Sequence, residues 1–170
     1  MKKRILSLLI LLSAATATMA YNSILAKLVK TDYEGKADSL TKVFIKEFMN
    51  TSKGTFWVTP KGVNSSNTYI YWQQAHAIDV VIYAYQRNLA AGNKTQANLY
   101  KNYVSKWFQN KGNNYSGGST GFENPYTDDM CWIALTLQRM GEVFNNNTYF
   151  STAKKLFDNG IMSRAKEDEK

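Results

Sequence analysis

The sequence predicts an all-α fold built from antiparallel helix hairpins. Apolar residues recur at helical spacing through successive segments, and short sequences rich in Gly and Asn separate these segments. Short connections of this kind join helices that run antiparallel to each other. A chain of 170 residues is long enough for one domain with a hydrophobic core.

The first predicted helix covers residues 39–50, with Asp38 or Ser39 as its N-cap. Its apolar side chains repeat on one face: Leu40, Val43, Phe44 and Phe48. Residues 51–67 carry Gly, Pro, Asn and Ser in turn-forming order, which predicts a loop. Within this loop, residues 56–58 are expected to form a short extended segment.

Four further helices are predicted, over residues 69–91, 95–109, 128–144 and 148–158. The first of these ends at Gly92-Asn93, a common C-terminal signal. The second is predicted to bury one row of side chains: Leu99, Tyr103, Val104 and Trp107. A loop rich in Gly, Asn and Ser precedes the third.

The N-terminal residues 1–20 have the three parts of a secretory signal peptide. Lys2, Lys3 and Arg4 give a positive start, an apolar run follows, and small residues lead to Thr18-Met19-Ala20. The apolar run is too short to serve as a stable membrane anchor. The sequence therefore predicts an exported protein, with residues 21–170 as its mature domain.

The charge of the chain gives little support for nucleic-acid binding. It has 21 Lys and Arg against 13 Asp and Glu, and three of the basic residues belong to the leader. The remaining basic residues are scattered among acids, so we expect no nucleic-acid partner. Cys131 is the only cysteine and follows the apolar pattern of its helix, so we expect a buried side chain. One His and scattered acids predict no metal site and no cofactor.

Two adjacent carboxylates, Asp128 and Asp129, stand at the start of the predicted helix 128–144. One interpretation is structural: Thr127 or Asp128 caps the helix, and Asp129 lies in the first turn, where an anion is favourable. The other is catalytic, because the pair follows a Gly- and Asn-rich loop and lies between Tyr126 and Trp132. Such aromatic side chains are typical of a sugar-binding cleft.

A second group of chemically capable residues lies on the predicted helix 69–91. Trp72, His76, Asp79 and Tyr83 are spaced i, i+4, i+7 and i+11, so they share one face of an otherwise apolar helix. The stripe could line a cavity. It could equally be a core histidine fixed by Asp79, with the aromatic rings packed around it.

Taken together, the two segments resemble glycoside hydrolase family 76, the endo-α-1,6-mannanases. The resemblance rests on residues 72–79, Trp-Gln-Gln-Ala-His-Ala-Ile-Asp, and on Tyr126-x-Asp128-Asp129-Met130-x-Trp132, followed by the helix around residues 149–158. It implies an (α/α)6 toroid whose helices point their ends at a sugar-binding groove. It also implies a retaining mechanism on α-mannan or mannooligosaccharides.

The resemblance implies that Asp128 is the nucleophile and Asp129 the acid/base. Retaining hydrolysis needs two carboxyl groups about 5–5.5 Å apart. The candidates for stacking on sugar rings are Trp72, Tyr126 and Trp132. The candidates for hydrogen bonds to sugar hydroxyls are Gln73, His76, Asp79 and Asn124.

The resemblance covers residues 38–158, about half of what a twelve-helix toroid needs. We therefore expect part of a toroid from a truncated sequence, with self-association as one way to cover the apolar edge of its last helices. The alternative is a helical carbohydrate-binding or interaction module that keeps these residues without a complete active site.

The leader gives a direct test. If residues 1–20 are a signal peptide, N-terminal sequencing of the protein recovered from its native host should begin near Tyr21. A mature protein that still begins with Lys2 and Lys3 would contradict the export prediction.

Overall fold

The computed structural model describes residues 33–63, 71–113 and 117–165. The chain divides into two compact units, Met1–Ser39 and Leu40–Lys170. The predicted leader, residues 1–20, lies outside the described residues. Within the described ranges, no helix is both long and apolar enough to cross a membrane.

The prediction of an all-α fold is confirmed. In the first unit, the described residues 33–39 are helical. Asp38 and Ser39 therefore lie inside a helical segment, and the prediction that either begins the helix is wrong. The hydroxyl of Ser39 donates to the carbonyl of Gly35 at 2.9 Å, a bond that a helix interior accommodates.

The second unit begins with helical residues 40–48 and a small hairpin. Strand β1 (Met49–Asn50) pairs antiparallel with β2 (Thr55–Phe56), so that Met49 lies opposite Phe56. The expected extended segment, residues 56–58, therefore overlaps β2 only at Phe56. A 3-10 turn, η1 (Pro60–Gly62), follows.

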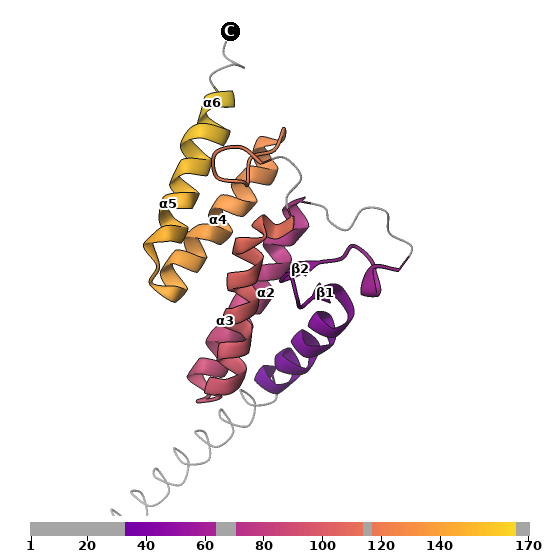
Figure 1. Cartoon of the computed structure of the whole chain (residues 1–170). Coiled ribbons are helices and arrows are strands. Elements are labelled where there is room, and N and C mark those ends of the chain that lie inside the picture. The colour runs from indigo at the N-terminus through magenta and orange to yellow at the C-terminus, as the bar shows by residue number, and fades with distance from the viewer. Residues whose placement is uncertain (1–32, 64–70, 114–116, 166–170) are drawn as a thin grey trace, which may run out of the picture. The chain divides into compact units, whose positions relative to one another are not determined.

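Two helix hairpins make up most of this unit (Figure 1). The first joins α2 (Tyr71–Ala90) to α3 (Lys94–Gln109), and the second joins α4 (Thr127–Phe144) to α5 (Asn147–Lys155). The turn after α4 uses Asn145 in the left-handed conformation, and the side chain of Asn146 caps α5. A π-helical turn, η3 (Leu156–Ile161), and a short helix, α6 (Met162–Ala165), continue α5 beyond its predicted end.

Helix α2 is the centre of the arrangement, because it packs against α3 on one side and α4 on the other. The contacts between α2 and α4 advance in the same direction along both helices. His76 contacts Trp132, and further along both helices Asp79 contacts Arg139. Helices α2 and α4 therefore run parallel, and their N-terminal ends lie at the same end of the bundle. The glycine-rich loop before α4 lies at this end as well.

The core is formed by the helix faces that meet between the two hairpins. Its largest fully buried side chains include Trp107, Tyr100, Phe122, Ile78, Ile82 and Met130. Aromatic contacts cross between the hairpins, with Tyr85 and Phe144 ring centroids 4.8 Å apart and Phe108 and Tyr149 also 4.8 Å apart. Such edge and tilted pairs are favourable beyond the area they bury.

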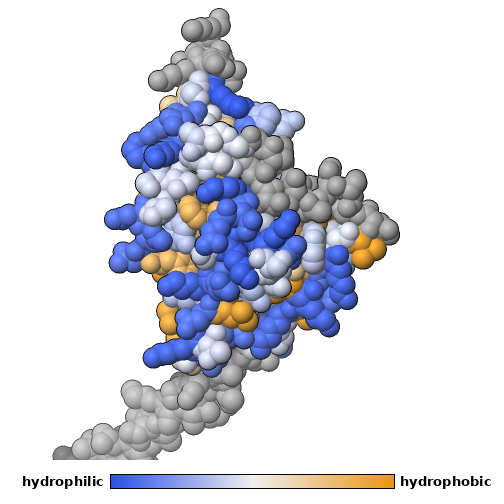
Figure 2. Space-filling view, in the orientation of Figure 1, coloured by the Kyte–Doolittle hydropathy of each residue, from blue (hydrophilic) through white to orange (hydrophobic). Residues whose placement is uncertain are grey.

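Two sequence predictions about burial are wrong. Leu99 is 41% exposed, and α3 instead buries Ala97 and Tyr100 together with the expected Val104 and Trp107. Cys131 is exposed, because α4 turns this side chain toward α5 at the surface instead of toward α2. On the face seen in Figure 2, hydrophilic residues predominate and hydrophobic ones form separate patches.

Gly54, in the β1–β2 turn, allows the hairpin to contact α3 closely. Its φ is +75°, and an added Cβ would lie 2.5 Å from the backbone nitrogen of Trp107 and 2.7 Å from the carbonyl oxygen of Tyr103. Two further bonds fix the turn: Lys106 donates to the carbonyl of Thr51 and Asn110 to that of Lys53, both at 2.9 Å.

We expect Gly54→Ala to lower the free energy of unfolding by at least about 2 kcal/mol, from positive φ and from overpacking against rigid backbone. Gly92→Ala is the matched control, because Gly92 has φ +79° but no atom within 4 Å of an added Cβ. Gly92→Ala should lower the free energy of unfolding only by the cost of a positive φ in a residue with a Cβ, about 1–2 kcal/mol. Urea unfolding of both variants measures the difference, and equal losses would contradict the close contact.

Candidate functional site

The site begins with the loop that leads into α4. Gly117, Gly118 and Gly121 all have positive φ, and the loop folds around the carboxylate of Glu123. This carboxylate accepts from the hydroxyl of Thr120 at 2.7 Å, from its backbone N–H at 3.1 Å, and from the hydroxyl of Ser119 at 2.9 Å. Partial burial raises the pKa of Glu123, but the bonds from Thr120 and Ser119 together bring that pKa below its usual value.

No side chain fits at Gly118, since an added Cβ would lie 2.4 Å from the Glu123 carboxyl carbon. The loop is therefore wound tightly on Glu123. Sequence reasoning missed this residue. The signal was available in Gly117-Gly118-Ser119-Thr120-Gly121, shortly before Glu123, a run of hydroxyl and backbone donors with the freedom to turn around an anion.

Phe122 attaches the loop to the core. Its side chain is fully buried, with its ring centroid 5.6 Å from that of Trp107 and 6.0 Å from that of Phe108. The hydroxyl of Tyr71, at the start of α2, donates to the carbonyl of Phe122. The loop is thereby fixed to α2 and α3 two residues before Asn124.

Asn124 connects the loop to the predicted catalytic pair. Its side chain is 1% exposed, its Nδ2 donates to Asp129 Oδ2 at 2.9 Å, and its Oδ1 accepts from the backbone N–H of Tyr126 at 2.9 Å. The N-cap position of α4 is Tyr126, whose side chain makes no capping bond. The capping interpretation named Thr127 or Asp128, and the structure places both inside the helix.

The two aspartates lie in different environments. Asp128 is exposed and Asp129 is partly buried. Burial raises the pKa of Asp129, the hydrogen bond from Asn124 lowers it, and the charge of Asp128 raises it; the net result is a raised pKa. One carboxyl group of the pair is thus shifted toward its protonated form, as an acid catalyst requires.

Aromatic side chains extend from the pair across to α2. Trp132 lies one turn after Asp128 on α4 and contacts His76, with ring centroids 4.7 Å apart. His76 in turn contacts Trp72 at 5.6 Å in an edge-on arrangement. We call Trp72, His76 and Trp132 the aromatic row. Its two indoles are 40% and 44% exposed, and Tyr126, near the pair, is 60% exposed.

The sequence left open whether His76 is a core histidine fixed by Asp79. His76 is exposed, so it is not a core histidine. Its expected partner, Asp79, instead binds the guanidinium of Arg139 through Oδ2, and Oδ1 has no hydrogen-bond partner among the described residues. Arg139 also lies over the ring of Tyr83, 5.5 Å from the ring centroid.

The Asp79–Arg139 pair is a second feature that sequence reasoning missed. The hydrogen bond that Arg139 donates to Asp79 is the main reason that the pKa of Arg139 is raised above its usual value. Arg139 is the one basic residue of α4, and a charged side chain within the apolar pattern of a helix is a signal that a partner lies on a neighbouring helix.

The structure thus brings together most of the predicted site residues. Asn124, Asp128, Asp129, Tyr126 and Trp132 lie at the start of α4, and Trp72 and His76 join them through the aromatic row. Gln73 faces a pocket on the other side of this row, and Asp79 is bound to Arg139. Among the described residues, no group of three or more His, Cys, Asp or Glu could hold a metal ion.

Comparison with protein-family models and with curated proteins finds no match for this chain.

The pKa of Asp129 provides a test of the site geometry. A carboxyl ¹³C NMR titration should place the pKa of Asp129 above the model-peptide value of about 3.9. Asn124→Ala removes the bond that stabilises the anion, so the pKa should rise further. Asp128→Asn removes a neighbouring negative charge, so it should fall.

The same shift has a consequence for stability. Because the folded-state pKa of Asp129 is raised, this group contributes stability that is fully present below its unfolded-state pKa and is lost as the pH rises through the folded-state pKa. If Asn124→Ala and Asp128→Asn moved the pKa of Asp129 in the same direction, that result would contradict the assigned contacts.

Proposed function

We propose that this chain is a glycosidase domain that cleaves α-1,6-mannosidic bonds by a retaining mechanism, with Asp128 as nucleophile and Asp129 as acid/base. The observation that carries the proposal is the different environment of two adjacent carboxyl groups at one helix end. Asp129, with its raised pKa and its bond to buried Asn124, suits proton transfer, and exposed Asp128 suits attack.

The proposed chemistry takes two steps. Asp128 attacks the anomeric carbon and forms a glycosyl ester, while the proton of Asp129 passes to the departing glycosidic oxygen. Asp129, now ionised, then takes a proton from water, and the resulting hydroxide displaces Asp128 from the anomeric carbon. The second step restores both carboxyl groups to their starting states.

The aromatic residues near the pair support a carbohydrate ligand. Trp72 and Trp132, which both contact His76, and Tyr126 are exposed aromatic side chains of the kind on which the apolar faces of sugar rings can stack. Asn124 is occupied by its two protein bonds, so its role is to position Asp129. Gln73 and His76 remain the candidates to bind sugar hydroxyls, and Asp79 is a weaker one because Arg139 already binds it.

The toroid is also part of this proposal. Parallel neighbours α2 and α4, each followed by an antiparallel partner, form the unit that an (α/α)6 toroid repeats. This arrangement would direct the N-terminal ends of α2 and α4 toward a common groove. Export through the leader at residues 1–20 fits a polysaccharide substrate outside the cell.

Asp128→Asn and Asp129→Asn should each remove nearly all release of oligosaccharides from α-1,6-mannan while leaving the circular dichroism spectrum unchanged. The amide is close in size to the carboxyl group but can neither attack nor transfer the proton. Asp158→Asn is the matched control, since Asp158 pairs with Lys154 on the surface of η3. Full activity in either site variant would refute the assignment.

A second candidate function, carbohydrate binding without cleavage, is favoured by the exposure of the aromatic row. Stacking on Trp72 and Trp132 needs no contribution from the carboxylates. In that case the wild type would bind mannooligosaccharides without cleaving them, and Trp132→Ala would weaken the binding.

A further inference from the structure

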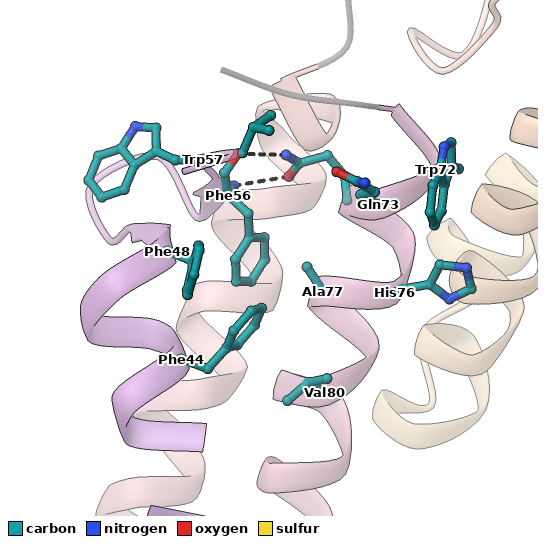
Figure 3. Close-up of a pocket in the computed structure, with 11 residues that line it drawn as sticks. Phe44, Phe48, Phe56, Trp57, Trp72, Gln73, His76, Ala77 and Val80 are labelled. Carbon is teal, nitrogen blue, oxygen red and sulfur yellow. Dashed lines mark hydrogen bonds between the residues drawn. The ribbon is translucent and has the colours of Figure 1, made fainter. Parts of the chain in front are cut away.

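A pocket of about 330 Å³ lies between residues 44–58 and α2 (Figure 3). Phe44, Phe48 and Phe56 converge on one side, and Ala77 and Val80 point toward them from α2. Trp72 and His76 lie on the other side of α2, at the edge of the pocket. The proposed cleavage site does not use the deep part of this pocket.

The pocket walls are aromatic and ordered. The ring centroids of Phe44 and Phe56 are 5.3 Å apart with planes inclined by 22°, and those of Phe44 and Phe48 are 5.7 Å apart at 30°. Offset, nearly parallel rings at such distances attract one another, and a further ring can add to the stack. The walls therefore favour a flat aromatic occupant over a flexible chain.

The wall opposite α2 is held by hydrogen bonds as well as by packing. Gln74, buried on α2, accepts from the backbone N–H of Phe56 at 3.0 Å and donates to its carbonyl at 2.7 Å. Trp57 is supported by Gly62, where an added Cβ would lie 3.1 Å from the indole ring. Such a wall is largely formed before a ligand arrives, which lowers the cost of binding.

The lining also selects against charge. The described residues that line the pocket include no Asp, Glu, Lys or Arg, and the polar groups at its edge are Gln73 and His76. A charged group, or a sugar with many hydroxyls, would lose its hydration there without replacement bonds. The volume is about twice that of a dry cavity of about 150 Å³ that holds benzene, and it lies at the lower end of the range for ligand pockets.

We propose that this pocket is a binding site for an uncharged aromatic group of one or two fused rings, with any polar substituent directed toward Gln73 and His76. The proposal goes beyond the hydrolysis of mannan and does not depend on it. Binding is measured without turnover, so failure of one proposal leaves the other standing.

The test is isothermal titration calorimetry of the full chain with 2-naphthylmethanol. We expect saturable binding at one site, at least tenfold tighter than binding of 2-naphthoate, which has the same rings and a negative charge. Ala77→Phe fills the pocket from α2 and should weaken binding of 2-naphthylmethanol at least tenfold. Ala134→Phe is the matched control, because Ala134 lines a different pocket, between α4 and α5 beside Cys131 and Phe150, and it should change this binding less than twofold.

Val80→Phe keeps the test decisive if Ala77→Phe disturbs folding, because Val80 points into the pocket and is 39% exposed, so a larger side chain there disturbs little core packing. It should also weaken binding several-fold while the circular dichroism spectrum stays unchanged. The proposal is overturned if no saturable binding occurs, if 2-naphthoate or octan-1-ol binds as tightly, or if folded pocket variants bind as the wild type does.

Discussion

The buried amide of Asn124 is the contact on which the candidate site depends. One side chain accepts from the backbone N–H of Tyr126, the residue that precedes α4, and at the same time donates to the carboxyl group of Asp129. Burying an amide costs free energy unless its hydrogen bonds are made. The buried position of Asn124 therefore requires both of these bonds. Phe122 and Glu123 bring Asn124 to this position by fixing the loop, one through the core and the other through its own hydrogen bonds.

Helix α2 connects the two places where ligands are proposed to bind. Its face toward α4 carries Trp72 and His76, and its face toward residues 44–58 carries Ala77 and Val80. Gln74, on the side of α2 toward β2, fastens this strand to the helix. The position of this one helix therefore sets both the spacing of the aromatic row and the width of the pocket.

Three carboxyl groups near the site, those of Glu123, Asp79 and Asp129, have different hydrogen-bond partners. Hydroxyl and backbone donors stabilise the anion of Glu123 and lower its pKa. Asp79 accepts a hydrogen bond from the guanidinium of Arg139. Asp129 is treated differently, because its one donor does not offset burial and the charge of Asp128. The pKa of Asp129 is raised and that of Glu123 is lowered, and Asp129 lies beside exposed Asp128, which is why proton transfer is assigned to it.

Local sequence patterns predicted the all-α class and the limits of α2, α3 and α4 to within about two residues, but neither the start of the first helix, already helical at residue 33, nor the continuation beyond residue 158. The correct predictions follow from local physics: helical spacing, turn residues and caps act over one or two turns. Which side chains contact one another, and which are buried, depends on the tertiary structure. Arg139 reaches Asp79 across 60 positions, Tyr100 is buried instead of Leu99, and Cys131 faces out. These outcomes depend on the rotation of each helix against its neighbours, which periodicity alone fixes only to within about one residue, or 100°.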